Sequence, residues 1–269
     1  MKNKPFIAVG VIVMTIVVIT CLAFFSSPRS NLKRVTIPEG LRKEQIADLL
    51  AGQLDWSDDE KRAWVTTYTA LKVDYLEGVY FPDTYLIPID ERPIDVAGRL
   101  QRRFDEMFSP YSQEALEQNI KWTTVVTLAS LVQREAADND DMPLIAGILW
   151  NRLNEDMKLD VDATVQYARD HINHYGEAPG AYQSVDYVIE GDWWKPIQIT
   201  DKQIDSAFNT YTHSGLPPHP ISNPGIESIE AVLNSEETDC LYYLHDADKN
   251  IHCTETYSEH QTNIEKYIR

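Results

Sequence analysis

The chain has 269 residues, of which 43% are hydrophobic and 10% aromatic, so it is long and apolar enough to form a folded core. Its 42 acidic side chains outnumber 24 basic ones, which gives a formal net charge of −18. Because nucleic acids require a basic protein surface, this balance excludes a nucleic-acid partner. The acidic residues by themselves indicate a solvated surface and identify no substrate.

An apolar run from Phe6 to Phe25 near the amino terminus has no charged side chain. A run of this length can span a bilayer, and the residues after it match a signal-peptidase site poorly. We therefore expect residues 1–27 to form a cytoplasmic stub and an uncleaved transmembrane anchor. The flanking basic residues do not fix the orientation of this anchor in the inner or plasma membrane, and the expectation that the rest of the chain lies outside the cytoplasm depends on the function considered below.

Residues 28–88 are predicted to form a linker and a small strand-helix module. We expect a strand over 34–40, an amphipathic helix over 42–51, and a second helix that begins at the capping box Ser57-Asp-Asp-Glu60 and runs to Leu71. The aromatic stretch from Leu76 to Tyr85 predicts a loop that leads into a strand. Its aromatic residues either line a cleft or close the core between modules.

Residues 89–269 are predicted to form one mainly helical domain. Apolar spacing and helix-start signals predict helices over 93–108, 113–118, 123–137, 143–154 and 225–233, another from Asp162, and a last one from Tyr257. Weak periodicity predicts a long loop over 171–203, and a β-hairpin is expected over 241–245 and 251–255. The expected fold class is α+β, with an N-terminal transmembrane helix, a small module, and a mainly helical domain that ends in a β-hairpin.

The helix predicted over 123–137 places one carboxyl group, that of Glu135, on an apolar face. Leu128, Leu131 and Val132 lie seven, four and three positions before it and share that face. Burial there should raise the pKa of the carboxyl toward the range of a general acid. A rim glutamate paired with a basic neighbour would explain the same pattern without catalysis.

No metal or cofactor is expected. The acidic cluster from Asp138 to Asp141 lacks the glycine and the distal glutamate of a calcium loop, and Asp141 is interpreted as the N-cap of a helix with Pro143 in its first turn. His213 has no second histidine or cysteine at the spacing of zinc ligands.

Three further features have two interpretations each. Arg152 either pairs with a carboxylate of the site or, as we favour, lies exposed on the surface. Trp193 and Trp194 suit stacking on a sugar, although tryptophan is more often buried in a core. Cys240 and Cys253 flank the predicted hairpin but do not face one another in a simple register, so we favour unpaired cysteines over a disulfide.

Seven short motifs follow one another between about residue 34 and the end of the chain, and this ordered set resembles the YceG-like family. They are Leu76-Glu-Gly with Phe81-Pro-Asp-Thr-Tyr85, Ala129-Ser followed by Glu135, Asn151-Arg-Leu153, Asp162-x-Thr-Val165, Asn209-Thr-Tyr followed by Gly215-Leu-Pro-Pro218, Asn223-Pro-Gly225, and Thr256-Tyr-x-Glu-His260.

The resemblance implies a membrane-anchored enzyme that cuts the glycan strands of peptidoglycan internally. It would cleave between N-acetylmuramic acid and N-acetylglucosamine and leave a 1,6-anhydro end without using water. By position, the family's catalytic glutamate falls on Glu135, which would act first as acid and then as base. The family pattern implies no cofactor or metal, peptidoglycan synthases as partners, and substrate-binding roles for Asp162, Thr164, Asn209, Tyr211 and Glu77.

Two alternatives stay open beside this function. One is a scaffold that binds the cell wall without cleaving it, and the other is a hydrolytic muramidase in which water attacks. A cap at a helix start would by itself explain Asp162.

The chain departs from the family pattern in three places. Gln133 stands where relatives commonly carry a second glutamate, and because it lies on another helix face than Glu135, we expect only a supporting contact to change. The segment 28–88 keeps one strand-helix unit, which resembles half of a LysM-like module. The insertion with Trp193 and Trp194 has no counterpart that we can place.

Overall fold

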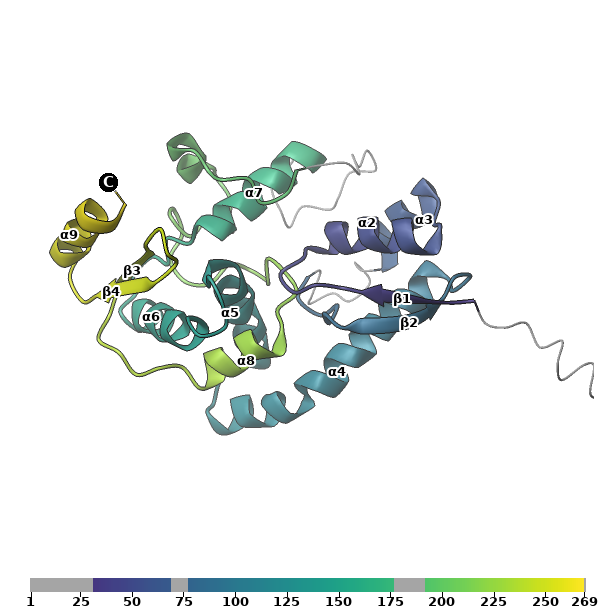
Figure 1. Cartoon of the computed structure of the whole chain (residues 1–269), viewed down its shortest axis with the longest axis horizontal. Helices are drawn as coiled ribbons and strands as arrows, with labels where there is room; N and C mark the ends of the chain where they lie inside the picture. Colours follow the sequence, from purple (N-terminus) through teal and green to yellow (C-terminus); the bar gives the residue numbers. More distant parts are fainter. Residues whose placement is uncertain (1–30, 69–76, 177–191, 269) are drawn as a thin grey trace, which may run out of the picture.

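The computed structural model describes residues 31–68, 77–176 and 192–268. The predicted stub and anchor over 1–27 lie outside these residues, as do the end of the helix expected to reach Leu71 and the middle part, 177–191, of the loop expected over 171–203. Figure 1 shows the arrangement of the described elements, with the module at one end and the C-terminal hairpin at the other.

The expected fold class needs a correction, because it included a transmembrane helix. Within the described ranges, no helix is both long and apolar enough to cross a bilayer. α4 (Pro93–Glu117) has 25 residues, but it carries charged side chains such as Arg99, Arg102 and Arg103 along its length. The described part of the chain is a mixed helix-and-strand fold in which helices predominate.

The module is built on two strands that are distant in sequence. β1 (Leu32–Thr36) pairs antiparallel with β2 (Thr84–Pro88), and α2 (Lys43–Leu54), α3 (Asp58–Ala63) and a π-helical turn (Trp64–Tyr68) lie between them along the chain. The capping box at the start of α3 is confirmed, because the Ser57 hydroxyl accepts from the backbone N–H of Glu60, whose carboxylate accepts from the backbone N–H of Ser57 at 2.9 Å.

One long helix, α4, replaces the two helices predicted over 93–108 and 113–118. The interval between the two predicted helices contains Pro110, a residue type that lacks a backbone donor and is disfavoured in a helix interior. In the structure Pro110 lies within the helix. Before the proline, Phe104 and Phe108 stack 5.2 Å apart and both contact Trp122, and after it Ala115 is buried, so the helix packs on the core on both sides of Pro110.

α5 (Trp122–Glu135) forms the centre of the larger part of the molecule. Its apolar residues from Val125 to Val132 are buried, and it packs against α4, α6 (Met142–Asn154), α7 (Asp162–Tyr175) and α8 (Ile226–Leu233). Figure 1 shows α5 between α8 and α7, with α6 beside it. Because neighbours surround α5, the position of its last residue is strongly constrained.

The region predicted as one long loop, 171–203, is partly helical. α7 continues to Tyr175, where Gly176 ends it in the left-handed conformation, and a 3-10 helix covers Ile199–Gln203. The loop prediction is wrong at both of these ends, because the polar residues of α7 alternate with a buried face that packs on the core.

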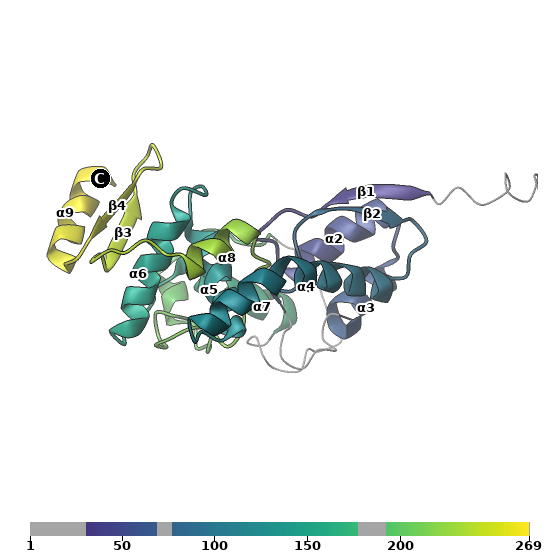
Figure 2. The same ribbon diagram turned by 90° about the horizontal axis from the view of Figure 1, so that it is seen from below.

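The C-terminal unit consists of β3 (Tyr242–His245), β4 (Ile251–Thr254) and α9 (Tyr257–Tyr267), and it projects at one end of the elongated molecule, as Figure 2 shows. The strands pair with Tyr243 opposite Cys253. Asp246 closes the turn between them by accepting from the backbone N–H groups of Asp248 and Asn250 at 2.9 Å.

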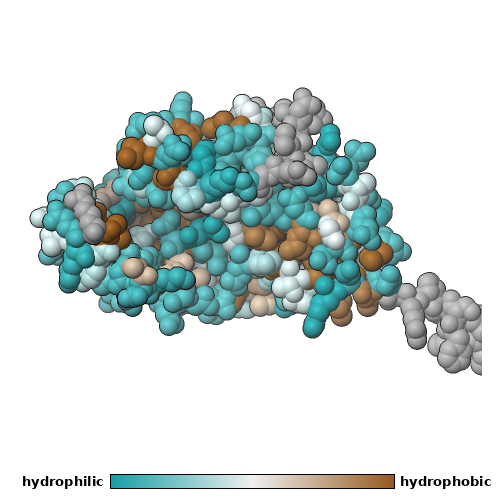
Figure 3. Space-filling model, turned by 45° about the horizontal axis from the view of Figure 1, so that its top comes forward, coloured by the Kyte–Doolittle hydropathy of each residue, from teal (hydrophilic) through white to brown (hydrophobic). Residues whose placement is uncertain are grey.

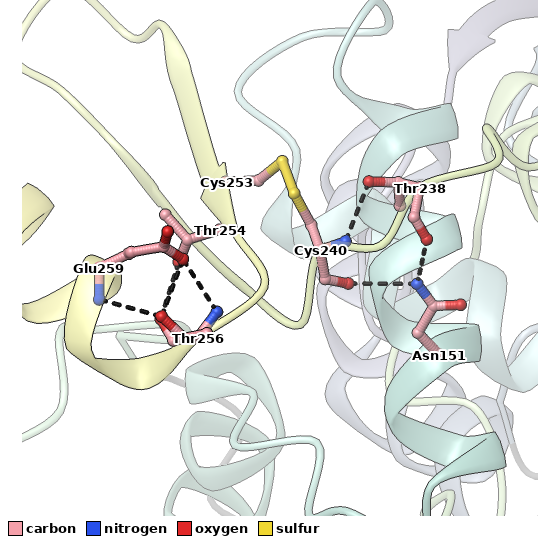
Figure 4. Close-up of a disulfide and its surroundings, with 7 residues drawn as sticks. All are labelled: Asn151, Thr238, Cys240, Cys253, Thr254, Thr256 and Glu259. Carbon is pink, nitrogen blue, oxygen red and sulfur yellow. Dashed lines mark hydrogen bonds between the residues drawn. A yellow bond between two sulfur atoms is a disulfide. The ribbon is translucent and has the colours of Figure 1, made fainter.

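Cys240 and Cys253 form a disulfide, so the favoured interpretation of unpaired cysteines is wrong (Figure 4). Cys240 lies before β3, where the chain leaves the strand direction. Its carbonyl accepts from the Asn151 side chain at 3.2 Å, and its N–H donates to the Thr238 hydroxyl. This bend brings the two Cα atoms within 5.8 Å, a separation that a straight hairpin register does not give.

The surface is mainly hydrophilic on the face shown in Figure 3, with hydrophobic residues gathered in small patches. This agrees with the excess of acidic over basic side chains in the sequence. The described surface therefore resembles that of a protein whose large hydrophobic side chains are mostly used in its core.

Candidate active site

Glu135 is the last residue of α5, and its carboxyl group is held by two donors from distant segments. The Tyr243 hydroxyl, on β3, donates to Glu135 Oε2 at 2.8 Å. The backbone N–H of Ala163, in the first turn of α7, also bonds to the carboxyl. Glu135 as a whole residue remains partly exposed, so it is fixed by the protein and lies at the surface of the site.

The environment favours the protonated form of Glu135. Burial raises the pKa of its carboxyl, and the nearby negative charge of Asp162 raises it further. The hydrogen bonds from Tyr243 and Ala163 act in the opposite direction, as does the charge that His245 can carry. A carboxyl in this balance can release a proton and is then stabilised as a carboxylate by donors already in place.

A second contact, between His245 and Asp141, holds β3 beside Glu135. His245 Nε2 lies 2.9 Å from Asp141 Oδ2. Asp141 occupies the N-cap position of α6, as predicted, but its side chain makes no capping hydrogen bond and contacts the hairpin instead. Tyr243 and His245 are two residues apart, so both lie on the face of β3 that meets α5 and the start of α6.

A polar cluster of Asp162, Lys202 and Tyr211 lies at the start of α7. The Tyr211 hydroxyl donates to Asp162 Oδ1 at 2.6 Å and accepts from Lys202 Nζ at 2.8 Å, while Lys202 Nζ lies 3.6 Å from Asp162 Oδ1. Val161 is the N-cap residue of α7, so Asp162 is exposed and is not the cap that the sequence indicated. Burial, followed by the charge of Asp162, raises the pKa of Tyr211.

Asn209 and Thr164 are buried behind this cluster. The Asn209 amide donates to the carbonyls of Lys202 and Ile204 and accepts from the backbone N–H of Tyr211 at 3.0 Å. Thr164 Oγ1 shares a 2.9 Å hydrogen bond with Thr210. Both side chains are enclosed, so this geometry lets them position Tyr211 and Lys202 and gives them no direct route to a ligand.

Glu77, the remaining candidate site residue, does not contact Glu135 or its hydrogen-bond donors. It is fully buried at the junction with the module, where its two oxygens accept from the backbone N–H of Lys43 at 3.0 and 3.1 Å and Oε1 accepts from the Asn223 side chain at 2.6 Å. Asn223 also accepts from the backbone N–H of Tyr80. The observed contacts join two segments of the chain and leave no exposed surface for a substrate.

Arg152 is buried, so the prediction of an exposed arginine is wrong. Its guanidinium donates to the carbonyls of Leu241 and Leu159 at 2.6 Å and lies 3.9 Å from Asp160. These bonds tie the end of α6 to the segment before β3. The long side chain is used to satisfy backbone acceptors inside the fold.

Trp193 and Trp194 are not a free platform on the surface. The Arg42 guanidinium lies 4.4 Å from the Trp193 ring and the Arg134 guanidinium lies 4.2 Å from the Trp194 ring. Trp194 Nε1 donates to the Gln45 side chain, which connects this segment to the module. Both rings are therefore used for packing between segments.

Gln133 makes the supporting contact expected of it. Its side-chain oxygen accepts from the backbone N–H of Gly225 at 2.9 Å, next to Glu39. The contact lies on another side of α5 than Glu135. Among the residues that the structure describes, no group of three or more histidine, cysteine or acidic side chains is placed to hold a metal ion.

Sequence reasoning missed Tyr243, His245 and Lys202. The alternation of Tyr243 and His245 in a predicted strand was a usable signal, because it places two polar groups on one face. It gave no indication that this face would meet a residue 108 positions earlier in the chain.

Comparison with known proteins identifies the family. The model of the YceG-like family matches residues 18–266. An endolytic murein transglycosylase of Bacillus subtilis (strain 168) is 29% identical over 255 residues, which are 87% of this chain and 65% of that relative. An endolytic murein transglycosylase of Streptococcus pneumoniae serotype 2 (strain D39) is also 29% identical, over 88% of this chain and 45% of its own length.

A solved structure agrees with these matches. The crystal structure of a YceG-like protein from Listeria monocytogenes superposes with a TM-score of 0.71 at 28% identity, over 86% of this chain and 75% of that one. The chain spans between about half and two thirds of the length of the curated relatives it matches. The resemblance seen in the seven ordered motifs is confirmed, and the chain belongs to the YceG-like family.

Proposed function

We propose that this protein is an endolytic lytic transglycosylase of peptidoglycan, with Glu135 as its acid and base. The observation that carries the proposal is that Glu135, a partly exposed residue, has a carboxyl group with two fixed hydrogen-bond donors and a raised pKa. The two curated relatives described above, both named endolytic murein transglycosylase, support the same substrate class.

The proposed reaction needs one carboxyl group and no water. Glu135 donates its proton to the glycosidic oxygen as the bond between that oxygen and C1 of the muramic acid residue breaks. The 6-hydroxyl of the same sugar forms a new bond to C1 and gives its proton to the Glu135 carboxylate. The enzyme returns to its starting protonation state, and the product carries a 1,6-anhydro end.

The surroundings of Glu135 suit both halves of this cycle. Burial favours the protonated acid before cleavage, while the Tyr243 hydroxyl and the Ala163 N–H stabilise the carboxylate formed by proton transfer. Asp162 is exposed beside the site and would face the positive charge that develops at C1. Tyr211 and Lys202 hold the orientation of its carboxylate.

Asp162 also favours a second candidate, a hydrolytic muramidase. Hydrolysis requires a second carboxylate to activate water or to act as nucleophile, and Asp162 lies near enough to Glu135 to raise its pKa. A hydrolase would leave reducing ends in place of anhydro ends. The Asp162→Asn variant would then lose activity as completely as a variant of Glu135.

The test is mass spectrometry of the products formed from uncrosslinked glycan strands by the wild-type chain and by Glu135→Gln. Glu265→Gln, an exposed change on α9, serves as the matched control. Anhydro ends from wild type and control alone would support the transglycosylase. Reducing ends would establish the muramidase, and strands that are bound but never cut would establish a scaffold.

We further propose that the described part of the chain works outside the cytoplasm. Its proposed substrate is found there, and the Cys240–Cys253 disulfide suits an oxidising compartment. Thiol labelling in intact cells that finds both cysteines free would contradict this location. Peptidoglycan synthases are the partners that the family resemblance implies, and co-purification with the wild-type chain would test them.

A further inference from the structure

Arg134 precedes the proposed catalytic glutamate, whose charge acts on it, but Arg134 makes no ion pair with any residue that the structure describes. Its guanidinium lies 4.2 Å from the centre of the Trp194 ring, and its Nε is buried without a hydrogen-bond acceptor. No carboxylate of the described residues lies within ion-pair distance of it, and the side chain remains partly exposed. The planar group is therefore fixed by stacking, with its outer nitrogens free to bind.

Of the half-buried arginines that the structure describes, Arg99, Arg103 and Arg169 are in ion pairs, whereas Arg134 and Arg62 are not, although acidic side chains outnumber basic ones by 42 to 24. Other arginines that line the larger part of the molecule are paired. Arg169 binds Asp170 at 2.8 Å, and Arg152 lies 3.9 Å from Asp160. Removing a cation from water without a partner costs free energy, which stacking on tryptophan only partly offsets. A ligand with a negative charge would supply the missing partner.

The distance between the contacts that Glu135 and Arg134 make along α7 limits which group of the substrate Arg134 can bind. Glu135 contacts Ala163 in the first turn of α7, whereas Arg134 contacts Trp194. The backbone N–H of Trp194 donates to Asp170 at 2.8 Å, which is two helical turns further along α7. At 1.5 Å per residue, the two contact points are about 10 Å apart along the helix.

The opposite side of Arg134 is formed by the turn that leads into the module. A Cβ atom placed on Gly40 would lie 3.5 Å from both Cδ and Nη1 of Arg134. The guanidinium thus sits between Trp194 and this turn, beside the reacting bond but not at it. A glycan chain carries hydroxyl and acetamido groups and has no charge to offer there.

We propose that Arg134 binds a carboxylate of the peptide stem attached to the muramic acid residue at the scissile bond, so that the enzyme selects stem-bearing strands. This inference rests on the proposed function. The stem branches from the lactyl group of that sugar and carries carboxylates at several angstroms from the glycosidic bond. The two outer nitrogens of arginine match a carboxylate in a bidentate arrangement.

The experiment compares wild type, Arg134→Gln and Arg102→Gln on three substrates. Arg102→Gln is the control, because it removes an exposed charge from α4. The substrates are uncrosslinked strands with peptide stems, the same strands with the stem carboxylates amidated, and strands from which the stems have been removed and whose freed lactyl carboxylates have been amidated. Steady-state kinetics on each substrate give KM and kcat separately.

On stem-bearing strands, we expect Arg134→Gln to raise KM about tenfold or more, the fold-change typical of a lost charge-assisted hydrogen bond. On amidated or stem-free strands, its KM should stay within about twofold of wild type. An equal loss on all three substrates, or no loss on any, would overturn the proposal. If wild type cuts no substrate, the proposed function itself fails, which is a distinguishable result.

Discussion

Two regions of this protein bury carboxyl groups, and they differ in what surrounds each group. At the junction with the module, Glu44 is enclosed with Arg42 at 3.2 Å and accepts from the Tyr175 hydroxyl. Burial alone would raise the pKa of Glu44, but the charges of Arg42 and Lys43 outweigh it and lower the pKa to about 2. At the site, Glu135 has hydrogen-bond donors but no basic partner within ion-pair distance among the described residues, and its pKa is raised.

Glu77 shows that a raised pKa alone does not mark a catalytic acid. Burial, and then the charge of Glu44, raises the pKa of Glu77 as well. Both of its oxygens, however, are occupied by donors and the residue has no exposed surface, whereas Glu135 is partly exposed. The comparison teaches that proton transfer to a ligand requires a raised pKa together with an accessible oxygen.

The largest expected effect is on the rate after Glu135→Gln. The substitution keeps the size of the side chain and removes the transferable proton, so we expect kcat to fall about 10³-fold. Because the ionised form of Glu135 is disfavoured in the folded protein, removing it should leave Tm unchanged or slightly higher at neutral pH. Product formation and calorimetry on one preparation check both expectations.

At the junction, the opposite pattern is expected for Glu77→Ala. The change leaves the Lys43 N–H without its acceptor, removes one of the two acceptors of the Asn223 amide and opens a small cavity. We expect the free energy of unfolding to fall by about 3 kcal/mol, with kcat per folded molecule retained. Guanidinium unfolding measures the first quantity. A stable variant that loses activity would instead restore Glu77 to the substrate-binding residues.

The Cys240–Cys253 disulfide is expected to affect both the stability of the hairpin and the activity of the site. Cys240 and Cys253 are separated by 13 residues and enclose β3, which carries Tyr243 and His245. Replacing both cysteines by serine should destabilise the hairpin by about 3 kcal/mol and lower kcat about tenfold, because Glu135 loses a fixed donor. Hydrogen exchange of the β3 amides and kinetics check this. Full activity in the double variant would show that the hairpin holds Tyr243 without the bond.

The smallest expected effect is a shift in the pH profile of Tyr243→Phe. The Tyr243 hydroxyl stabilises the ionised form of Glu135, so its removal should raise the pKa of the carboxyl further. Activity requires the protonated acid, so the alkaline limb of kcat/KM should move up by about 0.5 to 1 pH unit. An unmoved limb would mean that the hydroxyl does not act through Glu135.

The sequence was informative wherever a pattern is local. The apolar spacing before Glu135 predicts α5, the capping box at Ser57 predicts the start of α3, and Thr256 caps α9 where the last helix was expected to begin. Each of these features depends on residues within one or two helical turns. The error in α4 has the same origin, because a local rule for Pro110 was outweighed by packing against distant residues.

The site could be predicted only in part, because its contacts join remote segments. Helix geometry indicated Glu135, but its bond to Tyr243 spans 108 residues and the bond between Asp141 and His245 spans 104. The disulfide was missed for a related reason: the bend at Cys240 depends on Asn151 in another helix. No periodicity within a strand or helix specifies which face of a hairpin meets which helix end.

The register of the hairpin carries one more consequence. Tyr243 and His245 face the core, while Tyr242 packs against His260 and Tyr257 of α9 on the opposite side. Because side chains alternate along a strand, adding or deleting one residue between the Cys240–Cys253 bond and Tyr243 would exchange the two sets. Tyr242 and Leu244 would then point toward Glu135. The number of residues between the disulfide and Tyr243 therefore decides which side chains surround Glu135, and one inserted residue would replace both Tyr243 and His245 there without any substitution in the hairpin.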